Sequence, residues 1–538
     1  MAREIAPATL AHLLDTDSAL ALIDVREHGE YNQAHIPGST SVPRRQLEPR
    51  MGRLVPFRGV QVVLCDDNGR RAALAAQTLE RMGYTRVAVL EGGVNRWASL
   101  EKPTEWGMNV PSKDFGEKME VQHHVPTIDA DELARRQRRG DPLLIVDTRT
   151  PEEYRRFCIP GGRSAPGGEL ALRIHDLVRE HPGATVVVNC AGRTRSIIGA
   201  RVLQRMALPN VLSLRNGTSG WLLAGFELEC GADRVDLPAP SPEGRAKAEA
   251  FAARVAAEDG VQMLDVAGLE ALMARAVAET VYPIDVRTRE EYAAGHIPGF
   301  AWFPGGQAVQ RADDTVAVRT GIVIFCCDGT ARASVTASWY RQMGFPNVYA
   351  VAGGTTAWKA AGKSLAAGTD EPVEPLVAAA RERVRQVAPS ALAALLASSR
   401  PPAVLNVETS DRFAAGHVPG ARWLSRSWLE LRLAELAADK NAPLVVTDED
   451  GHDAVLAAAT IEELGYKDVA ALAGGMEAWR KEGRPVEQGL TGVMRPPDDV
   501  VPAGPDRGYA DMINYLRWEE KLGHKYAPTG EAHVGPTP

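Results

Sequence analysis

The sequence predicts an α/β protein built from four tandem domains, each with a parallel sheet covered by helices on both faces. One observation behind this prediction is a long segment that occurs four times. The copies read LIDVREHGEYNQAHIPGS, IVDTRTPEEYRRFCIPGG, PIDVRTREEYAAGHIPGF and VLNVETSDRFAAGHVPGA, anchored at Asp24, Asp147, Asp285 and Asn406. The anchors lie 123, 138 and 121 residues apart. That spacing is typical of whole domains and too long for a solenoid repeat.

A second motif follows later in each copy and supports the same division. It reads EGGVNRW at 91–97, RNGTSGW at 215–221, AGGTTAW at 352–358 and AGGMEAW at 473–479. Its spacing does not match the Gly-x-Gly-x-x-Gly fingerprint of nucleotide-binding loops. We interpret each copy as a tight turn followed by an aromatic plug for the core.

Between the two motifs, each copy has a short apolar run and then a helical pattern. In the first copy VQVVLC precedes RRAALAAQTLERMGY, where Leu74, Thr78, Leu79 and Met82 recur at helical spacing and Gly83 supplies the stop. Short apolar runs that alternate with amphipathic helices indicate βαβ units and a parallel sheet with both faces covered.

Composition excludes several classes of protein. Lys and Arg number 61 against 69 Asp and Glu, a net charge of −8, and no sustained basic patch indicates a nucleic-acid partner. No apolar run approaches the ~18 residues of a membrane span, and the N-terminus lacks the apolar core of a signal peptide. We therefore expect a cytoplasmic protein without a membrane partner. Six cysteines without zinc spacing predict neither a disulfide framework nor a metal site.

The order Asp-Val-Arg, Glu-Tyr, His-Ile-Pro-Gly, cysteine loop and Gly-Gly-x-x-x-Trp strongly resembles the rhodanese homology domain, over about residues 1–490. The resemblance implies four tandem rhodanese-like three-layer domains, each with a five-stranded parallel sheet. It also implies a sulfurtransferase that works through a cysteine persulfide, with thiosulfate a common donor and cyanide or a thiol as acceptor. No cofactor or metal is expected. The predicted boundaries are 1–108, 120–232, 255–368 and 378–490, with a C-terminal arm and short helix over 491–538.

The stretch VVVNCAGRTRSIIGA places Cys190 where a buried strand ends and a helix begins. Backbone N–H groups and the positive helix end favour the thiolate, the reactive form of cysteine. Arg193 and Arg195 add charge that would hold a dianionic donor. We predict that Cys190 is the catalytic nucleophile. The predicted substrate-binding residues are Ala191, Gly192, Arg193, Thr194, Arg195 and Ser196, with Arg332 in the third copy.

Aligning the four helices shows which copies carry this cysteine. One column holds Asp66, Cys190, Cys327 and Asp448, and the second and third copies share Cys-x-Gly-x-x-Arg. Aspartate is no nucleophile for sulfur transfer, so we interpret Asp66 and Asp448 as helix caps and the first and fourth copies as inactive. The fourth copy also lacks the Asp-x-Arg pair of the others.

Cys327 is the second candidate nucleophile. Asp328 beside it opposes thiolate formation, and Arg332 is the single arginine of its loop. The neighbouring Cys326 leaves a strained redox pair as an alternative. On the same alignment Cys65 lies one residue early and is expected to be a core cysteine.

The remaining motif residues are interpreted as structural. Cys158 stands where the other copies have His35, His296 and His417; it could resolve a persulfide, but a packed thiol is favoured. Cys230 is also expected to be a buried structural thiol. The histidines beside Pro-Gly are expected to have a positional role, and the Asp-x-Arg pairs to form structural ion pairs.

The arm contains YADMINYLRWEEKL, a helix too short to be stable alone. We expect it to dock on the body or on a second subunit, which would give a homodimer; a frayed tail is the alternative.

Two other functions stay open. A cysteine phosphatase would need Cys-x5-Arg, whereas Arg195 and Arg332 stand at the fifth position after the cysteine, in a loop too short for phosphate. A scaffold or sulfur-relay protein would use the inactive copies to bind partners.

Overall fold

The computed structural model describes residues 3–369 and 373–527 and contains four sheets of five strands each. The end of the predicted arm, residues 528–538, and residues 370–372, between the predicted third and fourth domains, lie outside the described residues. Every sheet is parallel, with one strand order: β1-β5-β4-β2-β3 in the first, and the equivalent order in the other three. The prediction of four α/β domains with parallel five-stranded sheets is confirmed.

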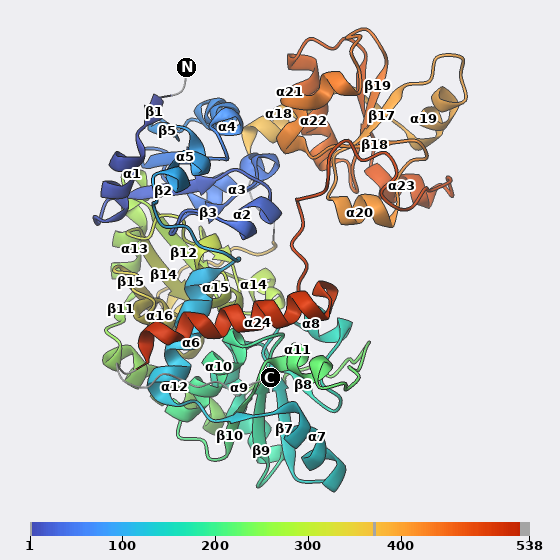
Figure 1. Cartoon of the computed structure of the whole chain (residues 1–538). Helices are drawn as coiled ribbons and strands as arrows, with labels where there is room; N and C mark the ends of the chain where they lie inside the picture. Colours follow the sequence, from blue (N-terminus) through green and yellow to red (C-terminus); the bar gives the residue numbers. More distant parts are fainter. Residues whose placement is uncertain (1–2, 370–372, 528–538) are drawn as a thin grey trace. The chain divides into compact units, whose positions relative to one another are not determined.

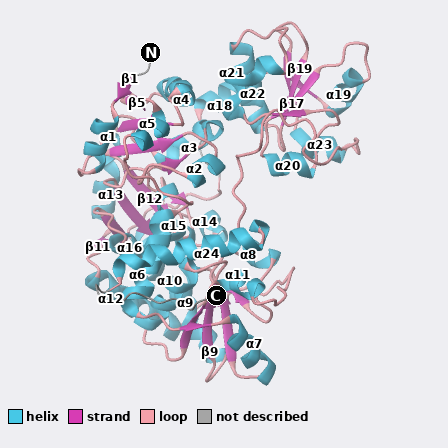
Figure 2. Ribbon diagram, viewed as in Figure 1, coloured by secondary structure: helices cyan, strands magenta, loops and turns pink. Residues whose placement is uncertain are grey.

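The four repeats have equivalent elements (Figures 1 and 2). The strands of repeats one and two are β1 (Arg3–Ile5), β2 (Leu20–Asp24), β3 (Thr40–Ser41), β4 (Gln61–Cys65), β5 (Val87–Leu90), β6 (Thr127–Ile128), β7 (Leu143–Asp147), β8 (Arg163–Ser164), β9 (Thr185–Asn189) and β10 (Val211–Leu214). Those of repeats three and four are β11 (Gln262–Leu264), β12 (Val281–Asp285), β13 (Ala301–Trp302), β14 (Ile322–Cys326), β15 (Val348–Val351), β16 (Gln386–Val387), β17 (Ala403–Asn406), β18 (Arg422–Trp423), β19 (Leu444–Thr447) and β20 (Val469–Leu472).

Helices cover both faces of each sheet (Figure 2). In repeats one and two they are α1 (Pro7–Leu14), α2 (His28–Gln33), α3 (Leu47–Leu54), α4 (Arg70–Arg81), α5 (Gly93–Ser99), α7 (Ala130–Arg139), α8 (Pro151–Arg156), α9 (Gly167–Glu180), α10 (Thr194–Arg205) and α11 (Gly217–Leu223). In repeats three and four they are α13 (Val266–Ala274), α14 (Arg289–Ala294), α15 (Gly305–Gln310), α16 (Ala331–Gln342), α17 (Gly354–Ala360), α19 (Pro389–Leu396), α20 (Ser410–Ala415), α21 (Leu429–Arg432), α22 (His452–Glu463) and α23 (Gly475–Lys481).

Four further helices lie outside the repeats. They are α6 (Val110–His123), α12 (Pro242–Glu258) and α18 (Pro375–Arg383), which precede repeats two, three and four, and the arm helix α24 (Tyr509–Gly523). Helix α6 packs on α10, α12 packs on α16, and α24 packs on α6 (Figure 1). The arm helix therefore docks on its own chain, as one of the alternatives predicted. No helix in the described ranges is long and apolar enough to cross a membrane.

The chain forms two compact units, and each contains two repeats. Among the described residues, 3–108 and 373–501 form one unit, and 109–369 and 502–527 form the other. In the second unit the glycine-rich stretch of repeat two meets repeat three. A Cβ on Gly168 would lie 2.7 Å from the backbone nitrogen of Gly306, so these glycines allow α9 and α15 to approach closely.

Candidate active site

The loop that carries Cys190 joins the central strand β9 to α10. Strand β9 ends at Asn189 and α10 begins at Thr194. The N-terminal turn of α11 holds the loop, because the N–H groups of Thr218 and Ser219 donate to the carbonyls of Cys190 (2.9 Å) and Ala191 (3.0 Å). The adjoining segments therefore fix the backbone around the cysteine.

Gly217 makes this contact with the loop possible. Its φ is +52°, and any Cβ there would overlap the carbonyl of Cys190. Gly93 and Gly354 stand in the same relation to the carbonyls of Asp66 and Cys327. From the sequence, this motif is predicted to be only a turn and an aromatic plug. The loop-packing role was missed, although an invariant glycine at one spacing in all four copies was the available signal.

The Cys190 thiol is buried, with 2% of the residue exposed. Its Sγ lies 3.5 Å from the hydroxyl of Ser196, which donates to the carbonyl of Arg193. Burial raises the pKa of the thiol, against Arg195, Ser196 and the N–H of Gly192, which lower it. The sequence predicts a lowered pKa, so that prediction is wrong for this closed arrangement, because loss of solvent outweighs the loop's positive groups.

Both arginines of the loop are already paired with carboxylates. Arg195 forms two bonds to Glu153, at 2.7 and 2.9 Å. Burial raises the pKa of Glu153, but Arg195 outweighs it and holds that pKa at about 2. Arg193 binds Glu117 of α6 at 2.7 and 2.8 Å, and it also pairs with Glu120 and Glu520. Its guanidinium group is therefore held by α6 and by the arm helix α24.

Helix α24 covers the Cys190 loop. The hydroxyl of Tyr515 donates to Oε1 of Glu519 (2.9 Å), and the Thr194 hydroxyl lies 3.4 Å from the same oxygen. A Cβ on Gly192 would lie 3.2 Å from Oε2 of Glu519 and 3.7 Å from Leu516. Sequence reasoning missed these arm residues, because nothing in the helix pattern identifies the surface on which it docks.

Repeat three presents its cysteine in a different environment. Cys327 is fully buried, and burial together with Asp328 raises the pKa of its thiol to about 11, against the pull of Arg332. Arg332 pairs with three carboxylates, those of Glu169, Glu291 and Asp328. Two of the loop's N–H groups, at Thr330 and Ala331, donate to Glu249 of α12 (3.1 and 3.4 Å). The carboxylate of Glu249, on the helix that precedes repeat three, therefore lies against this loop.

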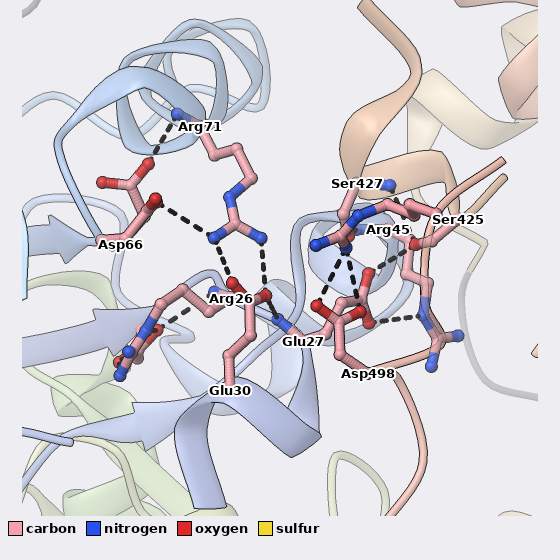
Figure 3. Close-up of polar contacts among 12 residues, drawn as sticks. Arg26, Glu27, Glu30, Arg45, Asp66, Arg71, Ser425, Ser427 and Asp498 are labelled. Carbon is pink, nitrogen blue, oxygen red and sulfur yellow. Dashed lines mark hydrogen bonds and ion pairs between the residues drawn. The ribbon is translucent and has the colours of Figure 1, made fainter. Parts of the chain in front are cut away.

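In repeats one and four the aspartate fills its own loop. Asp66 accepts from the backbone N–H groups of Asn68 (3.1 Å), Gly69, Arg71 (2.7 Å) and Ala72 (3.3 Å), and Figure 3 shows its carboxyl beside Arg71. Asp448 accepts in the same way from Gly451, Asp453 and Ala454. Burial raises the pKa of both carboxyls, to about 7 for Asp448, and these N–H groups oppose that rise. The two side chains accept first-turn amides, as a helix cap does, but the N-cap residues themselves are Gly69 and Gly451, three positions later than the sequence predicts.

A buried polar network lies beside the loop of repeat one and joins it to repeat four (Figure 3). Glu27 is paired with Arg45 (3.3 Å) and accepts from the hydroxyl of Ser425. The indole of Trp428 lies between Arg71 and Arg495, at 4.0 and 3.9 Å from the guanidinium carbons. Repeat four therefore closes the loop that Asp66 occupies.

The other cysteines lie in three kinds of environment. Cys65 and Cys326 end their strands, fully buried in core clusters, as predicted for Cys65. Cys158 packs in a small cluster with Tyr154 and Ala232, as favoured from the sequence. Cys326 and Cys327 are both free thiols. Cys230 is exposed, so its prediction as a buried thiol is wrong: it follows the core-forming elements of its repeat, where no sheet or helix covers it.

The repeated motifs are structural, as predicted. Arg26, Arg149 and Arg287 each form a buried bidentate pair with the aspartate two residues earlier and donate to a carbonyl eight residues later. His35, His296 and His417 stack on Tyr31, Tyr292 and Phe413 at ring distances of 3.8, 3.8 and 3.7 Å. The motif tryptophans donate to the carbonyls of Pro103, Glu227, Ser364 and Pro485. Among the described residues no group of His, Cys, Asp and Glu could hold a metal ion.

A family model described as "Rhodanese-like domain" matches the chain at residues 6–100, 129–224, 267–361 and 388–482. The chain belongs to the rhodanese-like family. It is similar to the crystal structure of a thiosulfate sulfurtransferase from Pseudomonas aeruginosa, with 36% identity, 97% of each chain covered and a TM-score of 0.88.

Curated relatives match over shorter parts of the chain. A thiosulfate sulfurtransferase of Azotobacter vinelandii is 26% identical over 255 residues, which cover 40% of this chain and 93% of the relative. The "Putative sulfur carrier protein YrkF" of Bacillus subtilis is 32% identical over 94 residues, 18% of this chain. The latter match spans half of the relative's length.

Proposed function

We propose that the protein is a sulfurtransferase in which Cys190 carries sulfane sulfur as a persulfide from a donor such as thiosulfate to a thiol or cyanide. The relatives named as thiosulfate sulfurtransferases support the general activity. The observation that carries the proposal for Cys190 is that loops of this kind bind a negative charge with their backbone N–H groups. In repeats one and four the equivalent N–H groups converge on a carboxylate at the position of Cys190.

The same N–H groups surround Cys190 without a carboxylate in their midst. By alignment Gly192 and Ser196 correspond to Asn68 and Ala72, whose N–H groups bind Asp66. The amides of Gly192 and Ser196 lower the pKa of the Cys190 thiol against the larger effect of burial. Once it is deprotonated, the terminal persulfide sulfur carries a negative charge and would take the place of the aspartate carboxylate.

The reaction proceeds in two displacements. The Cys190 thiolate attacks the outer sulfur of thiosulfate, the S–S bond of the donor breaks, and sulfite leaves with the electron pair. The acceptor, a cyanide ion or a thiolate, then attacks the terminal sulfur and releases the Cys190 thiolate, forming thiocyanate or a new persulfide. A covalent intermediate of this kind predicts ping-pong kinetics.

The proposal is tested by the intact mass of the full-length protein after treatment with thiosulfate. We expect one added sulfur atom in the wild type and in Cys327→Ala, and none in Cys190→Ala. Two added sulfur atoms, each lost with its own cysteine, would make Cys327 a second centre. Retention of the added sulfur in Cys190→Ala would contradict the assignment.

A sulfur relay to a partner protein is the second candidate. It is favoured by the filled loops of Asp66 and Asp448, since two repeats without a nucleophile exceed what catalysis on small molecules requires. If persulfide on Cys190 passes only to a protein acceptor and not to cyanide or small thiols, the relay is the function.

A further inference from the structure

The arm helix brings one carboxylate against the Cys190 loop. Glu519 is 2% exposed, and its Oε1 is engaged by Tyr515 (2.9 Å). Its Oε2 lies 3.2 Å from the point that a Cβ on Gly192 would occupy. Within the described ranges this oxygen has no hydrogen-bond partner. A buried carboxylate oxygen without a partner is costly, so its position beside the loop requires an explanation.

The positive groups near the loop are committed elsewhere. Arg193 is bound by Glu117, Glu120 and Glu520, and Arg195 is bound by Glu153. The ammonium group of Lys113 lies over the rings of Tyr515 and Trp518, at 4.9 and 5.1 Å. Arg507 stacks on Tyr515 at 4.2 Å and pairs with Asp511, and Glu519 is the carboxylate that acts most strongly on Lys113. Together, six carboxylates lie around the loop against four cations. The approach to Cys190 is acidic, whereas the sequence motif alone predicts a cationic loop.

We propose that Glu519 determines the donor class of Cys190: it disfavours dianions such as thiosulfate and favours donors whose reacting end is uncharged, namely hydropersulfides. This inference rests on the proposed function and narrows its donor. A dianion that reaches Cys190 comes close to the Glu519 carboxylate where solvent is excluded, and like charges repel strongly there. A hydropersulfide carries no charge at its outer sulfur in the protonated form R–S–SH, and this is the form that a thiolate attacks.

The chemistry with such a donor is balanced. The Cys190 thiolate attacks the outer sulfur of R–S–SH, the donor's S–S bond breaks, and R–S⁻ leaves with the electron pair. The proton remains on the transferred sulfur, so Cys190 becomes a hydropersulfide. No dianion enters the pocket in this step, whereas thiosulfate would bring two charges against Glu519.

The test compares two alkylating reagents of similar size on the full-length protein. Iodoacetamide is neutral and iodoacetate is an anion, and modification of Cys190 is measured for both by peptide mass spectrometry. In the wild type we expect iodoacetamide to react much faster. In Glu519→Gln we expect the ratio of the two rates to fall by about tenfold. Glu227→Gln removes one exposed carboxylate from the same unit and should leave the ratio within about twofold, since an exposed charge is screened by solvent and salt.

Sulfur loading gives the second measurement. We expect Glu519→Gln to speed loading of Cys190 by thiosulfate about tenfold and to leave loading by benzyl hydropersulfide within about twofold. An unchanged reagent ratio in Glu519→Gln would overturn the inference. Equal acceleration with both reagents would also overturn it, because α24 would then act only as a cover. A ratio that falls while no donor loads sulfur would overturn the proposed function and leave the charge selection at Cys190 standing.

Discussion

The loops of repeats one and two share a frame and differ in the residue that the frame surrounds. In both, the helix after the next strand donates to the loop carbonyl, with Val94 to Asp66 at 2.7 Å and Thr218 to Cys190 at 2.9 Å. In both, the arginine five residues on is held by a glutamate. Asp66 fills the ring of N–H groups with its own carboxylate, whereas in repeat two the buried, uncharged thiol of Cys190 stands at that position. The loop backbone is therefore arranged to bind an anion both in the repeat that has the cysteine and in the repeat that lacks it.

Repeat three lies between these two cases. It has the cysteine of repeat two, but the carboxylate of Glu249 accepts from the N–H groups of Thr330 and Ala331. Of these two, Thr330 aligns with Gly69, a donor to Asp66. The carboxylate of Glu249 therefore stabilises this loop. Burial is the main reason that the pKa of the Cys327 thiol is about 11. The amides of Gly329 and Ala333 face the Cys327 thiol as those of Gly192 and Ser196 face Cys190, so the two loops differ mainly in the charged groups around them.

The largest expected effect comes from converting the loop of repeat two into that of repeat one. Cys190→Asp should reduce sulfur transfer at least about a thousandfold, because the nucleophile is lost. It should melt at a higher temperature than Cys190→Ala, because the new carboxylate accepts the loop's N–H groups as Asp66 does. Transfer assays and thermal denaturation measure the two effects. A Cys190→Asp protein that melts below Cys190→Ala would break the comparison.

A substitution at Gly217 should damage the frame itself. Gly217→Ala adds a Cβ that overlaps the carbonyl of Cys190 at a φ of +52°, and we expect a cost of about 2–4 kcal/mol from strain and overpacking. Gly225→Ala is the matched control, because its φ is +83° and nothing lies within 4 Å of the added atom; its cost should be about 1–2 kcal/mol. Urea denaturation measures both, and equal costs would show that the close packing is unimportant.

The smallest expected effect concerns the charge beside Cys327. The thiolate is the reacting form, so alkylation of wild-type Cys327 should rise about tenfold per pH unit between pH 8 and 10, below its pKa of about 11. After burial, Asp328 is a cause that raises this pKa, so Asp328→Asn should move the profile to lower pH and speed the reaction at pH 8 about threefold to tenfold. Iodoacetamide kinetics with peptide mass spectrometry measure this, and the exposed Cys230 serves as an internal reference. A profile displaced to higher pH would contradict the role given to Asp328.

Much of the fold could be predicted from the sequence, because the apolar runs and motif spacings are local signals repeated four times. The alignment of Asp66, Cys190, Cys327 and Asp448 in one column agrees with their places directly after β4, β9, β14 and β19. It also placed Cys65 one residue earlier, on the strand and in the core.

What the sequence could not provide are contacts between segments far apart in the chain. Glu519 meets the Cys190 loop more than 300 residues after it, and no periodicity in the arm identifies that surface. For the same reason the ion pairs of the loop's arginines could not be predicted, although Glu117 and Glu520 bind Arg193 in the structure. The predicted direction of the Cys190 pKa shift was wrong, because burial by a helix far away in the sequence leaves no pattern near Cys190 itself.

The docking of α6 and α24 on repeat two has a practical consequence for dissection of this chain. A fragment limited to residues 129–224, the extent of the family match, would keep Cys190 and its loop but lose both helices. Its thiol would meet solvent, and Arg193 would lose Glu117, Glu120 and Glu520 together. Such a fragment would react with anionic reagents, and with air, in ways that the intact chain does not. Kinetic constants measured on an isolated repeat would describe a different chemical environment from the one in which Cys190 works.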